Sequence, residues 1–191
     1  MSAGPSRLTL AWSREQARRS RAGFIRLSHL RQLQACEQVA AVCYRERGGS
    51  IEFLLVQTRG GRWTFPKGSA EPGLTHAQAA ALEAFEEAGV HGRIEEAAFA
   101  HYHRRRSGNK QRGSEDKRVS AHLCEVSRLD PPQESNRNRT WFSAEKAKER
   151  LRADRPSEYG TTLARVVDRA VARIQRLAGA AVADSSTIRY K

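Results

Sequence analysis

The chain has 191 residues, of which 39% are hydrophobic and 29% charged, and its net charge is +13 with an isoelectric point near 10.6. This length suits one compact domain with extensions and hardly two domains. No apolar run approaches the length of a membrane span, so we expect no transmembrane helix. A net charge of this sign attracts polyanions such as nucleic acids, polyphosphates and acidic membrane surfaces.

The three cysteines of the chain are Cys36, Cys43 and Cys124. Their number is odd and their spacing is not that of metal ligands. We interpret them as reduced thiols of a cytoplasmic protein, and neither a disulfide nor a zinc site is predicted. The sequence leaves the oligomeric state open.

Residues 1–35 form a strongly basic segment with seven arginines and one glutamate. This composition predicts a partly disordered or loosely helical extension. It also resembles an organelle transit peptide, and tethering to nucleic acid is a further alternative. We expect the folded domain to span residues 36–178 and a flexible tail to follow over 179–191.

Three strands are predicted before the first strong helix signal. The apolar runs at 38–45 and 51–57 are joined by a short turn that contains Gly48 and Gly49, as in a buried hairpin. A third, short strand is expected over 63–65.

The stretch 65–90 predicts a helix with its own start and stop signals. Thr75 and Gln78 fit a capping box, and Gly89 occupies the position of a left-handed C-terminal cap. Strands before and after this helix favour an α/β sandwich.

Three glutamates crowd one face of this helix. Glu83, Glu86 and Glu87 stand at i, i+3 and i+4, opposite an alanine-rich apolar face. Carboxylates this close repel one another unless a cation joins them, and hard ions such as Mg²⁺ or Mn²⁺ prefer oxygen ligands. The sequence therefore indicates a metal site, with a solvated acidic helix face as the alternative.

The spacing of these residues resembles the Nudix hydrolase signature, G-x5-E-x7-R-E-U-x-E-E-x-G-U, in which U is aliphatic. The signature aligns without a gap from Gly68 to Val90, with Glu83, Glu86 and Glu87 at its retained glutamate positions. Leu74 and Leu82 depart from it, because they stand where a glutamate and an arginine are expected.

The resemblance implies an α/β/α sandwich with a mixed β-sheet and a hydrolase that needs Mg²⁺ or Mn²⁺. It also implies metal ligands at Gly68, Glu83, Glu86 and Glu87, with the three glutamates as catalytic residues. In the family the signature arginine helps to hold the catalytic helix and its glutamate. Leu82 therefore leads us to expect an altered metal requirement or a lower rate, and an inactive site is the extreme alternative.

A basic segment follows the helix. We predict a strand over 93–102, a returning strand over 119–126, and between them a loop over 103–118 with seven lysines and arginines. The loop is either a phosphate-binding rim or an ordinary solvated loop.

The segment 134–151 strengthens the resemblance. Trp141 and Phe142 precede a helix that opens at Ser143, which resembles the diphosphoinositol polyphosphate and diadenosine polyphosphate hydrolases of the family. We interpret the aromatic pair as core anchors, with base stacking as the alternative. Arg137 and Arg139 are expected to point to one side. A second amphipathic helix is predicted over 161–177.

The resemblance implies a metal-dependent pyrophosphohydrolase that cleaves a phosphoanhydride of a nucleoside diphosphate derivative. Dinucleoside polyphosphates and diphosphoinositol polyphosphates are the favoured small anionic substrates. Basic residues would bind the phosphates, and the candidates are Lys67, Arg104, Arg105, Arg118, Arg137 and Arg139. Two alternatives remain open: an RNA 5′ pyrophosphohydrolase tethered by the basic N-terminal segment, and a Nudix-like module that binds a nucleotide or RNA without turnover.

Overall fold

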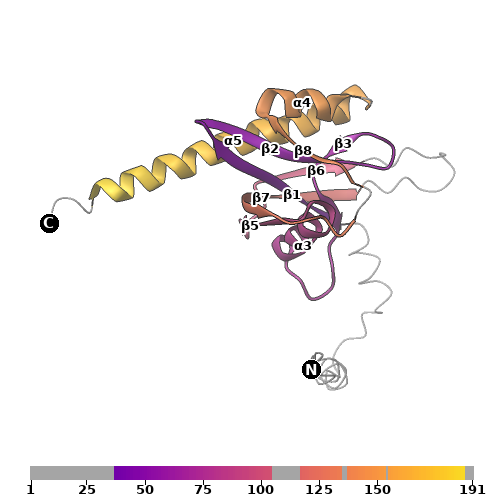
Figure 1. The fold of residues 1–191 in the computed structure, drawn as a ribbon, viewed down its shortest axis with the longest axis horizontal. Helices are drawn as coiled ribbons and strands as arrows, with labels where there is room; N and C mark the ends of the chain where they lie inside the picture. The colour runs from indigo at the N-terminus through magenta and orange to yellow at the C-terminus, as the bar shows by residue number, and fades with distance from the viewer. Residues whose placement is uncertain (1–36, 105–116, 135–136, 154, 188–191) are drawn as a thin grey trace, which may run out of the picture. The chain divides into compact units, whose positions relative to one another are not determined.

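The computed structural model describes residues 37–104, 117–134, 137–153 and 155–187, with side chains through residue 180. Within these residues eight strands form one sheet and three helices pack on it (Figure 1). The strands are β1 (Glu37–Arg47), β2 (Ser50–Gln57), β3 (Trp63–Thr64), β4 (Lys67–Ser69), β5 (Val90–Ile94), β6 (Ala100–Arg104), β7 (Lys117–Leu129) and β8 (Arg139–Ser143). The helices are α3 (His76–Ala88), α4 (Ala144–Arg152) and α5 (Ser157–Thr187). The predicted N-terminal extension, Cys36 and Arg105 lie outside the described residues.

The sheet is mixed, as predicted. Its main path runs β3-β2-β1-β7-β5, while β4 pairs with β1, β6 with β7 and β8 with β2. Strands β1 and β7 are parallel, and the other pairs are antiparallel.

Each face of the sheet has its own hydrophobic core. Along β1, Val39, Ala41 and Cys43 pack with the alanines of α3, whereas Ala40 and Val42 pack with α4 and α5. This alternation with a period of two places a helix layer on each side, and Figure 1 shows α3 on one side of the sheet and α4 with α5 on the other. The predicted α/β/α sandwich is confirmed. Cys43 and Cys124 are buried free thiols in the core under α3.

The first hairpin and the aromatic anchors are also confirmed. Gly48 and Gly49 join β1 to β2 with φ of +57° and +75°, the left-handed backbone that tight hairpins need. On β8, Phe142 packs in the core beneath α4 and α5, while Trp141 packs in the core beneath α3. The rings of Phe142 and Trp63 meet edge to face at 5.0 Å.

The single strand predicted over 93–102 is wrong, because two strands with a break occupy this stretch. Strand β5 ends at Ile94 and β6 begins at Ala100, and both pair with the long strand β7. The amides of Glu95 and Phe99 donate to the carbonyls of Leu123 and Ala121. Residues 96–98 therefore bulge out of the sheet between these two hydrogen bonds, opposite a single residue of β7. The pattern of apolar residues does not reveal such an irregularity.

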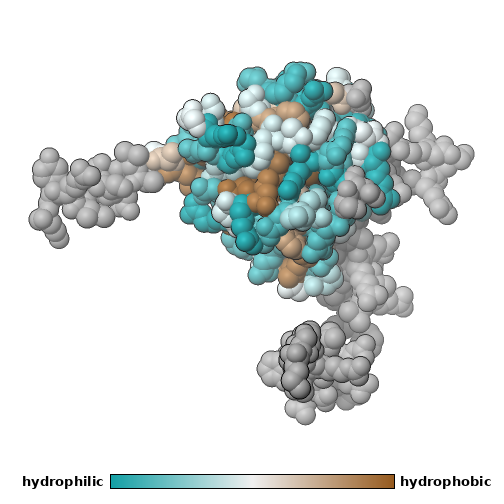
Figure 2. Space-filling view, in the orientation of Figure 1, coloured by the Kyte–Doolittle hydropathy of each residue, from teal (hydrophilic) through white to brown (hydrophobic). Residues whose placement is uncertain are grey.

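Helix α5 begins four residues before the predicted 161–177 span and continues to Thr187. Residues 175–180 along it are exposed, and Figure 2 shows a mostly hydrophilic surface on this face of the molecule. Among the described residues, the exposed large hydrophobic side chains are Leu74 and Leu177. None of the helices in these residues is both long and apolar enough to cross a membrane.

Both predicted caps of α3 are present. Thr75 Oγ1 accepts from the amide of Gln78 at 3.2 Å, and the amide of Thr75 donates to Gln78 Oε1 at 2.9 Å. At the other end, Gly89 adopts φ of +62° and donates to the carbonyl of Phe85 at 2.7 Å. A Cβ at Gly89 would overlap the backbone carbonyl of Asp130, so the helix ends against the chain that follows β7.

We predict that Gly89→Ala destabilises the protein far more than Gly48→Ala. Both glycines are left-handed, which costs an alanine roughly 1–2 kcal/mol, but a Cβ at Gly48 meets open space. The overlap with Asp130 should add about 1–3 kcal/mol at Gly89. Urea unfolding of both variants measures the difference, and equal losses of unfolding free energy would contradict the close packing at the end of α3.

Candidate active site

The candidate site begins with the carboxylates of α3. Glu87 is buried with 2% of its surface exposed, while Glu83 and Glu86 are half-buried beside it. The helix holds them on one side because its alanines pack against β1 and its neighbours on the other. The structure therefore brings together the three glutamates that the sequence analysis singled out.

Gly68 lies directly against Glu83. It is the central residue of β4, which pairs with β1 through Val39. A Cβ at this position would overlap the carboxylate of Glu83. The absent side chain thus lets a carboxylate approach the backbone of β4.

Glu87 is held from two directions. Its Oε2 accepts from the amide of Lys67 at 3.2 Å, and its Oε1 forms an ion pair with Arg137 Nη2 at 2.8 Å. Burial raises the pKa of Glu87, and the charges of Lys67 and Arg137 oppose this rise. The buried carboxylate therefore has partners for both of its oxygens.

Glu83 is destabilised as an anion. Burial raises its pKa to about 7, and repulsion from Glu87, Glu86 and Glu134 adds to the effect. A cation near this cluster would relieve the repulsion.

The sequence analysis missed Glu134 as a member of this cluster. Its amide donates to the carbonyl of Glu86 at 3.0 Å, and its negative charge raises the pKa of Glu83 and of Glu87. Glu134 lies outside the helix pattern, so only its position at the start of the segment that leads to Trp141 and Phe142 could have drawn attention to it.

Basic groups lie beside the acidic cluster. Burial lowers the pKa of Lys67 to about 8 even though Glu87 raises it, and the charges of Arg104, Arg137 and Arg155 lower it further. Arg104 Nη1 lies 3.4 Å from Gln38 Oε1. Arg118 is an exposed residue of β7, opposite His103 of β6.

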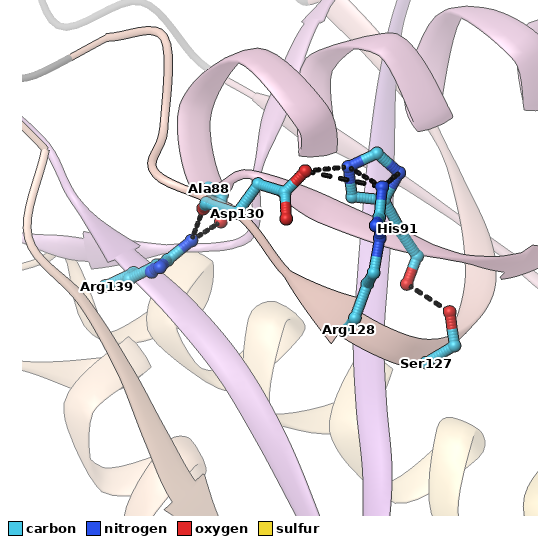
Figure 3. Close-up of polar contacts among 6 residues, drawn as sticks. All are labelled: Ala88, His91, Ser127, Arg128, Asp130 and Arg139. Atoms are coloured by element: carbon cyan, nitrogen blue, oxygen red, sulfur yellow. Dashed lines mark hydrogen bonds and ion pairs between the residues drawn. The ribbon is translucent and has the colours of Figure 1, made fainter.

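Arg137 and Arg139 both contact α3. Arg139 Nη1 donates to the backbone carbonyls of Ala88 and Asp130, which closes the C-terminal end of the helix (Figure 3). The Asp130 carboxylate in turn contacts His91 Nε2 at 2.8 Å. The last turn of α3 contains no basic residue of its own, so Arg139 supplies the positive charge that favours a helix C-terminus.

The chemistry of this site fits a hard divalent cation. Its ligand candidates are carboxylates and one backbone carbonyl, the oxygen donors that Mg²⁺ and Mn²⁺ prefer. Burial and, after it, repulsion from the neighbouring carboxylates raise the pKa of Glu83, and a cation would oppose both effects. As they stand, no three His, Cys, Asp or Glu side chains in the described part of the chain converge closely enough to hold a metal.

A family model for the NUDIX domain matches residues 36–163. The comparison with curated proteins found no match.

Several solved structures resemble the chain. A binary complex of the C. elegans Ap4A hydrolase is 25% identical with a TM-score of 0.55, over 73% of this chain and 97% of that one. The E. coli dihydroneopterin triphosphate pyrophosphohydrolase is 15% identical with a TM-score of 0.55, over 70% and 93%. The NUDIX domain of Shewanella oneidensis NrtR, with ADP ribose, is 16% identical with a TM-score of 0.54, over 72% and 87%. The last two likenesses concern the fold alone.

We predict that Gly68→Ala impairs function without unfolding the protein. The new Cβ would displace the mobile end of a side chain, Glu83, and not the backbone, so the melting temperature should change little. A carboxylate moved by about 1 Å should lower turnover on the order of 10²-fold. Ser69→Ala, at the exposed neighbouring position, is the matched control, and full activity of Gly68→Ala would contradict the packing of Glu83 on β4.

The raised pKa of Glu83 predicts how stability depends on pH. The folded protein binds more protons than the unfolded chain between the ordinary value of 4.5 and about 7, so the unfolding free energy falls as pH rises through this window. Glu83→Gln should therefore raise the melting temperature of the metal-free protein at pH 8 but not at pH 4. The exposed Glu71 provides the control variant Glu71→Gln. An unchanged melting temperature of Glu83→Gln at pH 8 would refute the raised pKa of Glu83 in the folded protein.

Proposed function

The chain belongs to the Nudix family of hydrolases, which act on pyrophosphate bonds, and we propose that it cleaves a phosphoanhydride of a nucleoside diphosphate derivative. Dinucleoside polyphosphates or diphosphoinositol polyphosphates are the favoured substrates. The observation that carries this proposal is that β4 brings the acidic and basic residues together: the amide of Lys67 donates to Glu87 Oε2 at 3.2 Å, and the charge of Arg104 lowers the pKa of the Lys67 ammonium.

Mg²⁺ or Mn²⁺ would be held by the Gly68 carbonyl and the carboxylates of Glu83, Glu86 and Glu87. When bound, such an ion neutralises phosphate oxygens and lowers the pKa of a coordinated water. The carboxylates of α3 would hold the ions and orient the water for in-line attack. A partly buried setting strengthens the attraction between a bound cation and these carboxylates, because less water screens it.

The basic side chains would hold the phosphates that flank the cleaved bond. Lys67, Arg104 and Arg118 line the ends of β4, β6 and β7, and Arg105 is proposed as a further contact from the sequence. Guanidinium and ammonium groups bind phosphate through charge-assisted hydrogen bonds. Arg137 and Arg139, the remaining candidates, direct their guanidinium groups at α3.

The likeness to the C. elegans Ap4A hydrolase, at 25% identity over 97% of that chain, favours the dinucleoside polyphosphate as substrate. The free thiols of Cys43 and Cys124 suit a reducing compartment, so we place the reaction in the cytoplasm.

Specific sequence features support two alternatives. The arginine-rich residues 1–35 would suit an enzyme that removes pyrophosphate from an RNA 5′ end. Leu82 and the exposed Leu74, at the signature's arginine and glutamate positions, would suit a module that binds nucleotide or RNA without turnover.

We predict metal-dependent release of phosphate or nucleotide from one class in a panel of phosphoanhydrides. The panel contains diadenosine polyphosphates, diphosphoinositol polyphosphates, nucleoside diphosphate sugars and 5′-triphosphate RNA, each with Mg²⁺ or Mn²⁺. Turnover should vanish with EDTA and should fall at least about 10²-fold in Glu86→Gln, which loses electrostatic stabilisation of the reacting phosphates.

The control variant is Glu46→Gln, because Glu46 is an exposed residue near the end of β1. This variant should keep full activity. Turnover of RNA alone, with a steep dependence on salt, would replace the favoured substrates by the RNA alternative. Tight binding of any panel member without turnover would replace the enzyme by the binding module.

A further inference from the structure

Helix α3 carries its carboxylates without any lysine or arginine of its own. Its sequence is HAQAAALEAFEEA, and Leu82 stands directly before Glu83. A buried carboxylate such as Glu87 is costly unless a cation or hydrogen-bond donors accompany it. The compensating charge must therefore come from other parts of the chain.

Arg137 is placed to supply this charge. Its Nη2 pairs with Glu87 Oε1 at 2.8 Å, and its Nε pairs with Glu134 Oε2 at 2.5 Å. The Glu87 side chain is 3% exposed and the Arg137 side chain 23%. One guanidinium thus bridges the buried carboxylate of α3 and the carboxylate of Glu134 through two different nitrogens, a geometry that suits the planar fork of arginine.

The chain on both sides of Arg137 is fastened to α3. Before it, the amide of Asp130 donates to the carbonyl of Gly89 at 2.8 Å, and the amide of Glu134 donates to the carbonyl of Glu86 at 3.0 Å. After it, Arg139 donates to the carbonyl of Ala88, the contact drawn in Figure 3. These backbone contacts fix the position from which the guanidinium of Arg137 reaches Glu87.

We infer that Arg137 is a positioning residue, which fixes the orientation of the Glu87 carboxylate for the proposed hydrolysis. Its guanidinium is committed to two carboxylates, so it acts on the reaction through Glu87 and not through the substrate. This inference rests on the proposed function for its kinetic consequence, while the coupling between Arg137 and Glu87 is a property of the protein alone.

The kinetic test compares Arg137→Met with wild type on the substrate that the panel identifies. Loss of an orienting partner should lower kcat about 10–100-fold. KM should stay within about twofold, because a residue that acts through Glu87 alone affects the chemical step and not the binding of substrate. A raised KM with unchanged kcat would overturn the inference, because it would make Arg137 a substrate contact. Arg128→Met is the matched control. Arg128 lies near the end of β7, is 64% exposed and pairs with Asp130, which belongs to the same segment between β7 and β8 as Arg137.

A second test needs neither metal nor substrate. Urea unfolding of the metal-free protein is measured for Arg137→Met, Glu87→Gln and the double variant. If the pair is coupled, the second substitution should shift the urea midpoint far less once the first is present, and the double variant, which buries no lone charge, should fold even if Arg137→Met does not. Strictly additive shifts would overturn the inference. This cycle gives its answer even if no panel member is hydrolysed, so failure of the proposed function and failure of the inference are distinguishable.

Discussion

The repulsion among carboxylates beside one helix face is the interaction around which this structure is organised. Glu83, Glu86 and Glu87 share α3, and Glu134 joins them from the chain after β7. A cluster of this kind opposes its own ionisation, because burial first and repulsion from Glu87, Glu86 and Glu134 second raise the pKa of Glu83 to about 7. The rest of the fold must therefore hold the helix and its acidic side chains in place.

Three features provide this support. The alanines of α3 pack closely on β1 and its neighbours, which brings the helix near the sheet. The glycine cap and Arg139 fix its C-terminal end. Arg137 and the amide of Lys67 bind the most buried carboxylate, Glu87. Packing thus sets the position of the backbone, and charge pairing sets the position of the side chain.

The sequence predicts those parts of the molecule that depend on local patterns. The period of the apolar residues, the capping box at Thr75 and the glycine at position 89 are enough to predict α3 with its caps, because each signal acts within a few residues. The near-continuous apolar runs of β1 and β2 likewise identify the centre of the sheet, which has a helix layer on both faces.

Features that depend on distant contacts were not predictable from the sequence. The break between β5 and β6 arises opposite β7, more than twenty residues later in the chain. The approach of Glu134 to Glu83 and the pairing of Arg137 with Glu87 require the return of the chain to α3 after β7. The contacts of Arg137 with Glu134 and of Arg139 with the carbonyl of Ala88 depend on the same return of the chain.

The claim that the acidic face of α3 is a cation-binding centre is tested most directly by a crystal structure of the protein soaked in Mn²⁺. The anomalous difference map would be calculated at the manganese edge. We predict a manganese peak among the carboxylates of Glu83, Glu86 and Glu87, next to the carbonyl of Gly68. Absence of a peak there at saturating Mn²⁺, or a strong peak elsewhere in the domain, would contradict it.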